Sequence, residues 1–167
     1  MKKIFAAALL TVFSAGTLAA EILPKPSGQV VLTVSGLIEN ENSDSSVVID
    51  LEMLKKLPQL RFSTKTIWTE GDVEFTGVSL KTVLEYVGFS GAKIEAIALN
   101  DYKIEIPVSG ISEKAPLVAY LMNGVEMPSR GKGPLWIVYP YDSDPKFRTE
   151  VIYSRSIWQL NRLNSVE

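Results

Sequence analysis

The sequence contains neither cysteine nor histidine among its 167 residues. The chain therefore has no thiolate or imidazole to hold zinc, copper or haem. Nucleophilic pairs of serine or cysteine with histidine are excluded for the same reason. No disulfide can stabilise an exported form of the protein, so the hydrophobic core must stabilise it alone. Any catalysis would depend on carboxylates, lysine or tyrosine.

Positive charge is scarce, and much of the N-terminal segment is uncharged. The chain opens with MKKIFAAALLTVFSAGTLAA, in which two lysines precede a short apolar run and a small-residue end. This pattern is typical of a secretory signal peptide, and the apolar run is short for a membrane span. We predict a signal peptide at 1–20, with cleavage after Ala19 or Ala20. Cleavage removes two of 17 basic and none of 19 acidic residues, so the net charge falls from −2 to about −4, which argues against a nucleic-acid partner.

No long linker, repeat or low-complexity segment divides the remainder. We predict an extended leader at 21–28, where two prolines occur, and a single domain at 29–167. Alternating and β-branched segments predict strands at 29–35, 60–68, 93–99, 102–108, 117–122 and 135–139. Asn100-Asp101 indicates a hairpin, and Asn123-Gly124 is typical of a type I′ turn. Polar loops are predicted at 36–46 and 69–76.

Helix signals are few and short. Asp50 is a predicted N-cap for LEMLKKL, which ends at Pro58, and Ser79 is a predicted N-cap for a helix that ends at Gly88. Near the C-terminus we predict a strand at 151–153 and a helical turn at 154–158. Strands and helices do not alternate strictly, so we predict an α+β fold with a mostly β core rather than a doubly wound sheet.

A cationic glycine loop precedes the apolar strand predicted at 135–139. It consists of Arg130, Gly131, Lys132 and Gly133. Flexible backbone with free N–H groups and two cations suits an anion or a heterocycle carbonyl. A solvated turn would have the same composition.

Aromatic residues and acids gather at the predicted strand ends. Trp68, Tyr102 and Tyr139 are candidate stacking surfaces for a flat ring, with edge packing as the alternative. The carboxylates of Asp101 and Asp144 could accept hydrogen bonds from a guanidine-like edge, or could belong to ordinary turns.

The segment YSRSIWQLNRL, from Tyr153 to Leu163, contains one further candidate. Arg155 and Trp158 are three residues apart, so on a helical turn they would be neighbours. Arg155 could then reach a ligand while Trp158 packs. The same segment could instead be a terminal element that closes the core.

Three motifs together resemble the sulfite-oxidase-type molybdopterin-binding fold. They are LMNGVEMPSRGKGPLWIVYP, TGVSLKTVLEYVG and LNDYKIEIPVS, whose order and spacing are more specific than any one of them. The resemblance covers roughly residues 30–163. It implies a mostly β fold with short helices and a pocket for a pterin.

The resemblance has one departure. The related oxidoreductases carry a molybdenum-ligating cysteine shortly before the Gly-Val-x-Leu helix, where this chain has Thr66-Ile67-Trp68-Thr69. A pterin pocket without the thiolate resembles a group of periplasmic pterin-binding regulators. That resemblance implies a non-enzymatic periplasmic protein that binds a reduced tetrahydropterin without molybdenum. It also implies docking on the periplasmic domain of an inner-membrane cyclic-di-GMP synthase/phosphodiesterase, and hence biofilm regulation.

The resemblance also implies where the candidate residues lie around the pterin. Trp68 would stack on the pterin, with the cationic loop as one wall and Arg155 closing the pocket. Two alternatives remain at this point. One is a divergent molybdenum-cofactor-dependent oxidoreductase with the metal held only by the pterin dithiolene, and the other is a structural module without any ligand.

Overall fold

The computed structural model describes residues 23–166, so the predicted signal peptide at 1–20 lies outside the described residues. Within them the chain forms a mostly β fold, with one sheet and a few short helices, which confirms the predicted fold class. None of the described helices is long and apolar enough to cross a membrane. The elements in chain order are β1 (Val30–Ser35), β2 (Ser46–Asp50), α1 (Leu51–Lys56), β3 (Gln59–Thr64), β4 (Val73–Ser79), α2 (Leu80–Tyr86), β5 (Lys93–Ala98), β6 (Lys103–Pro107), η1 (Val108–Gly110), β7 (Leu117–Met122), β8 (Val125–Glu126), β9 (Leu135–Val138), η2 (Pro145–Phe147), α3 (Glu150–Arg155) and β10 (Trp158–Val166).

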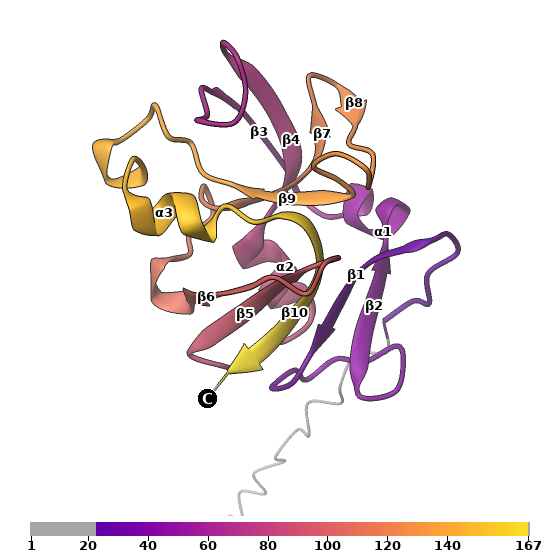
Figure 1. Ribbon diagram of the computed structural model, residues 1–167. Coiled ribbons are helices and arrows are strands. Elements are labelled where there is room, and N and C mark those ends of the chain that lie inside the picture. Colours follow the sequence, from indigo (N-terminus) through magenta and orange to yellow (C-terminus); the bar gives the residue numbers. More distant parts are fainter. Residues whose placement is uncertain (1–22, 167) are drawn as a thin grey trace, which may run out of the picture.

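The C-terminal strand β10 joins the parts of the sheet (Figure 1). It pairs in parallel with β1 and antiparallel with both β5 and β9. The main strand order is β2-β1-β10-β9-β7-β4-β3, while β5 continues from β10 to β6 and β8 pairs with β7. The last strand in sequence is therefore central in space.

β10 departs from regular pairing at Gln159. Its register with β9 shifts between Trp158 and Leu160, and its register with β5 shifts between Leu160 and Arg162. The φ of Gln159 is 53°. The Gln159 backbone N–H donates to the Lys132 carbonyl at 3.0 Å, and its carbonyl accepts from the Leu99 N–H at 2.9 Å. The irregularity thus attaches two loops, 128–134 and the β5–β6 turn, to the start of β10.

The predicted capping residues and turns are confirmed. The carboxylate of Asp50 accepts from the Met53 N–H at 2.8 Å, and the Ser79 hydroxyl accepts from the Thr82 N–H at 3.0 Å. Asn123 and Gly124 both have positive φ, 51° and 76°, as a type I′ turn between β7 and β8 requires. β5 and β6 form the predicted hairpin.

Other boundaries differ from the sequence predictions. Residues 47–49, for which no element was predicted, form strand β2 together with Ser46 from the predicted loop and the N-cap Asp50. The loop predicted at 69–76 already contains the start of β4 at Val73. The strand predicted at 60–68 ends at Thr64. The strand predicted at 151–153 lies inside helix α3, which the Thr149 hydroxyl caps, and the helical turn predicted at 154–158 ends at Arg155.

Candidate functional site

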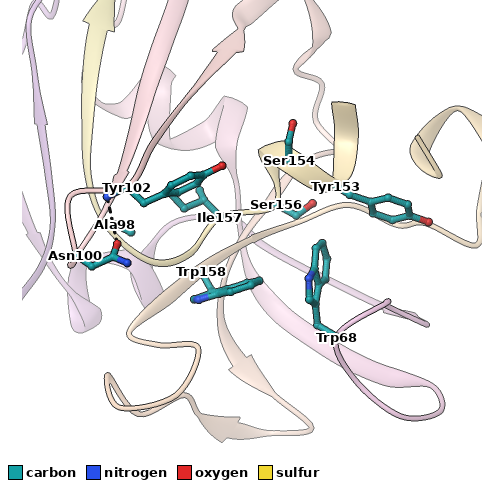
Figure 2. A pocket seen from close by; sticks show the side chains of 9 residues that line it. All are labelled: Trp68, Ala98, Asn100, Tyr102, Tyr153, Ser154, Ser156, Ile157 and Trp158. Carbon is teal, nitrogen blue, oxygen red and sulfur yellow. Dashed lines mark hydrogen bonds between the residues drawn. The ribbon is translucent and has the colours of Figure 1, made fainter. Parts of the chain in front are cut away.

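A cavity of about 370 Å³ lies at the start of β10, between the 65–72 loop, the β5–β6 turn and α3 (Figure 2). Most of its wall is aromatic or aliphatic, and its other lining residues are one asparagine and two serines. No charged side chain of the described chain lines it. The lining residues are Trp68, Ala98, Asn100, Tyr102, Tyr153, Ser154, Ser156, Ile157 and Trp158. We call this space the aromatic cavity.

Trp68 lies at the centre of a cluster of five aromatic rings. Its ring centroid is 5.8 Å from Trp136, 6.2 Å from Tyr141, 5.8 Å from Tyr153 and 5.7 Å from Trp158. All four contacts are close to edge-to-face, the arrangement that the aromatic quadrupole favours. Figure 2 shows the Trp68 and Trp158 indoles side by side, with Tyr153 reaching over from α3. The cluster therefore holds Trp68 in place while part of its surface faces the cavity.

The loop that carries Trp68 is held at its start and near Trp68 by hydrogen bonds. The Asp142 carboxylate accepts from the Lys65 N–H at 2.7 Å, and the Asp142 N–H donates to the Thr64 hydroxyl at 3.1 Å. The Trp68 N–H donates to the Thr66 hydroxyl at 3.0 Å. The hydrogen bond from the Lys65 backbone lowers the pKa of Asp142, so its carboxylate remains ionised near neutral pH.

The hydroxyl of Ser156 is already engaged at the back of the cavity. It accepts from the Tyr141 hydroxyl at 2.6 Å and donates to the Ile152 carbonyl at 2.8 Å. Burial raises the pKa of Tyr141, so that hydroxyl remains a donor. Asn100 uses its side-chain oxygen to accept from the Tyr102 N–H at 3.2 Å, which leaves the Asn100 amide N–H groups directed to no other described residue.

The cationic glycine loop, residues 130–133, does not present its glycine N–H groups to an anion. The N–H groups of Gly131 and Gly133 both donate to the Pro128 carbonyl, at 2.8 and 3.1 Å. A Cβ at Gly133 would lie 1.8 Å from the Met127 carbonyl oxygen, so only glycine fits there. Arg130 is exposed and forms no ion pair with any residue between 23 and 166.

Lys132 contacts the aromatic cluster rather than lining the cavity. Its Nζ lies 4.4 Å from the ring centroid of Trp158 and 4.9 Å from that of Trp136. Burial lowers the pKa of Lys132. These cation–π contacts fix one face of Trp158 against the loop.

The two predicted carboxylates are committed to local partners. Asp101 is exposed and forms an ion pair with Arg162. Asp144 caps η2 by accepting from the Lys146 N–H at 2.9 Å, a hydrogen bond that lowers its pKa, and its carboxylate lies 3.3 Å from the Lys146 ammonium. Neither lines the aromatic cavity.

The structure thus divides the predicted site residues. Trp68 and Tyr102 share the aromatic cavity, and Lys132 lies behind it, whereas Tyr139 and Arg155 line a separate cavity. Sequence reasoning did not assign Asn100, Tyr153 or Trp158 to a ligand site. Tyr153 and Trp158 lie in the C-terminal segment that it singled out, but the turn after α3 decides which of its residues face the cavity.

Fold and cavity together define a mostly β domain with a ligand-sized cavity between aromatic side chains. The sequence profile of the oxidoreductase molybdopterin-binding domain matches residues 25–142, and the chain belongs to this family. Among solved structures, the sulfane dehydrogenase SoxCD from Paracoccus pantotrophus shares the fold, with a TM-score of 0.59 and 18% sequence identity. The match covers 80% of this chain but only 37% of that one. Comparison with curated proteins finds no match.

The residues present do not fit a molybdenum centre held by a protein thiolate, since the chain has no cysteine. Among residues 23–166, no group of three histidine, cysteine or carboxylate side chains could hold a metal ion. Trp68 belongs to the segment in which the resemblance placed the metal-ligating cysteine. The aromatic walls do fit the flat ring system of a pterin.

Proposed function

We propose that this protein binds a reduced pterin in the aromatic cavity and acts as a periplasmic regulator rather than as an enzyme. The observation that carries the proposal is the exposed part of Trp68 in a cavity lined by Tyr102, Tyr153 and Trp158. Stacking on aromatic side chains favours a planar ring, and family membership makes a pterin the natural candidate.

The charge of the cavity favours a free pterin over molybdopterin. Molybdopterin carries a phosphate, and phosphate sites in proteins usually supply arginine, lysine or several free N–H groups. The described lining has no cation, and the N–H groups of Gly131 and Gly133 are used within their own loop. The amide N–H groups of Asn100 can instead donate to the uncharged edge of a pterin. The Ser154 hydroxyl donates to the Val151 carbonyl at 2.8 Å, so its oxygen can still accept from that edge.

The regulatory part of the proposal comes from the sequence resemblance. An exported pterin-binding protein without a metal thiolate would act on the periplasmic domain of an inner-membrane cyclic-di-GMP synthase/phosphodiesterase. For this, the pterin must change the affinity of the complex, and a coupling of about 1–3 kcal/mol is ordinary.

Ligand binding is tested first with wild-type protein isolated from the periplasm. We expect a bound pterin by mass spectrometry, and quenching of tryptophan fluorescence by added tetrahydrobiopterin under anaerobic conditions. Trp68→Leu should weaken binding by about five- to 150-fold, because the loss of ring stacking removes about 1–3 kcal/mol. Phe62→Leu, which removes a ring that packs on Phe75, is the matched control and should bind normally.

Two results would count against the proposal. One is protein that neither carries a pterin nor binds added tetrahydropterins. The other is about one molybdenum atom per isolated chain, which would favour the divergent oxidoreductase. Partner binding is checked separately by pull-down with the periplasmic domain of the cyclic-di-GMP enzyme, with and without pterin.

A further inference from the structure

A second cavity of about 250 Å³ lies between the β6–η1 segment and the η2–α3 segment. It shares no lining residue with the aromatic cavity, although α3 contributes to both. Its lining residues are Ile106, Pro107, Gly110, Tyr139, Lys146, Phe147, Ile152 and Arg155. We call it the Arg155 cavity.

Most of the Arg155 cavity is apolar. Ile106 is buried, Phe147 packs on Tyr139 with ring centroids 5.9 Å apart, and Pro107 and Ile152 complete the apolar lining. Such a surface favours a ligand with an apolar body over a small hydrated ion.

Two donors in this cavity have no acceptor among residues 23–166. Tyr139 is only 3% exposed, and its hydroxyl makes no hydrogen bond with any residue from 23 to 166. Burial raises the pKa of Tyr139 to about 12, so the hydroxyl keeps its proton. The hydroxyl oxygen itself is not fully enclosed, since the fully buried side-chain polar atoms without a partner among residues 23–166 are Asn161 Oδ1 and Arg162 Nε. The Tyr139 hydroxyl therefore faces the cavity, where a ligand or water can accept its hydrogen bond.

Arg155 is the second donor. Its guanidinium forms no ion pair with any described residue, and its charge acts on Tyr139 against the effect of burial. The position of Arg155 in the last turn of α3 complements the helix carbonyls, but this leaves the guanidinium N–H groups free. Lys146, by contrast, is already paired with Asp144.

We propose that the Arg155 cavity is a second ligand site, which takes a small monocarboxylate with an apolar body. The carboxylate would accept hydrogen bonds from the Arg155 guanidinium and the Tyr139 hydroxyl, the charge-assisted geometry that arginine forms with carboxylates. The apolar body would lie against Ile106, Phe147 and Ile152. The contacts that define this site are separate from those of the aromatic cavity.

Benzoate is the probe, and benzamide is its neutral counterpart of almost the same shape. Titration of the wild-type protein, followed by amide NMR spectra, should give saturable shifts at Tyr139, Ile152 and Arg155 with benzoate and much smaller ones with benzamide. Arg155→Gln should weaken benzoate binding at least about tenfold, because it removes a charged hydrogen-bonding partner. Tyr139→Phe should weaken it by a smaller factor.

Arg148→Gln is the matched control, since it makes the same charge change on the neighbouring exposed segment and should bind benzoate as the wild type does. Unaltered spectra away from the cavity show that each variant is folded. The proposal is overturned if benzoate and benzamide bind equally, if Arg155→Gln has no effect, or if no carboxylate probe saturates. Equal affinity for inorganic phosphate would overturn the apolar part of the assignment.

Discussion

At the scale of single residues, Ser156 connects the aromatic cluster to helix α3. It is 2% exposed, accepts from the Tyr141 hydroxyl at 2.6 Å and donates to the Ile152 carbonyl at 2.8 Å. Tyr141 in turn packs on Trp68 and Tyr153. One hydroxyl therefore aligns a ring of the cluster with the helix that covers the cavity.

Removal of the Ser156 hydroxyl alone should destabilise the protein more than removal of the Tyr141 hydroxyl alone. Ser156→Ala leaves the buried Tyr141 hydroxyl without an acceptor and should lower the free energy of unfolding by about 1–3 kcal/mol. Tyr141→Phe should cost about 1 kcal/mol, and the double variant should cost less than the sum of the two. Urea denaturation of the four proteins measures the coupling, and strictly additive costs would show that the hydrogen bond contributes nothing.

The sequence predicted correctly those residues whose contacts lie close to them in the chain. Asp50, Ser79 and Asn123-Gly124 act within a few residues of themselves, so their caps and turn could be read directly. The surroundings of Trp68 could not, because Trp136 and Trp158 reach it from distant parts of the sequence. Tyr139 and Arg155 illustrate the same limit, since nothing local shows that α3 separates them from Trp68.

At the scale of elements, the short helix α1 depends on its N-cap. The Asp50 carboxylate accepts from the Met53 N–H, and also from the N–H groups of Ser27 and Gly28 at 2.7 Å each. It is 1% exposed, so no water can replace these contacts easily. Asp50 thus starts the helix and fixes the extended segment before β1.

Asp50→Ala should lower the free energy of unfolding at pH 7 by about 2 kcal/mol, the upper end for loss of a cap. The hydrogen bonds from Gly28 and Met53 lower the pKa of Asp50 from its ordinary value of 3.8. The carboxylate therefore stabilises the fold above that ordinary pKa, and the benefit is lost as the pH falls through the lowered one. Urea denaturation at pH 7 and pH 3 should show a smaller difference between variant and wild type at pH 3.

The exposed Asp44 provides the control for this prediction. Asp44→Ala should change the stability by less than about 0.5 kcal/mol at either pH. An equal cost of Asp50→Ala at both pH values would contradict the role of the ionised carboxylate.

Elements with local signals were predicted better than elements defined by pairing. β2 has only three β-branched residues between a polar loop and a helix N-cap, and its ladder with β1 establishes it as a strand. β10 is interrupted at Gln159, so alternation of apolar and polar residues breaks down within it. The β-branched residues of α3 favoured a strand, but the Thr149 cap and the packing of the segment produce a helix.

At the scale of the whole molecule, the last strand, β10, connects the other parts of the sheet. β10 pairs with β1, β5 and β9, which span the sequence from Val30 to Val138. The family profile ends at residue 142, before this strand. The matched region therefore does not contain all of the sheet.

A chain that ends at Asp142 should not fold. It would expose the edges of β1, β5 and β9 together with the apolar surface that Leu160 and Leu163 cover. We expect loss of near-UV circular dichroism and of NMR dispersion. Removal of only Val166 and Glu167 should preserve both signals, and a folded chain ending at Asp142 would contradict the central role of β10.

Helix α3 has two opposed faces, and each face lines a different cavity. Tyr153 and Ser154 line one cavity, while Ile152 and Arg155 line the other. If each cavity binds its ligand, a shift of this short helix would change the affinity of both cavities. The effect of the first ligand on the affinity for the second must then equal the effect of the second on the affinity for the first. The two small molecules would then strengthen or weaken each other's binding by the same factor, so the affinity measured for either one would depend on whether the other is present.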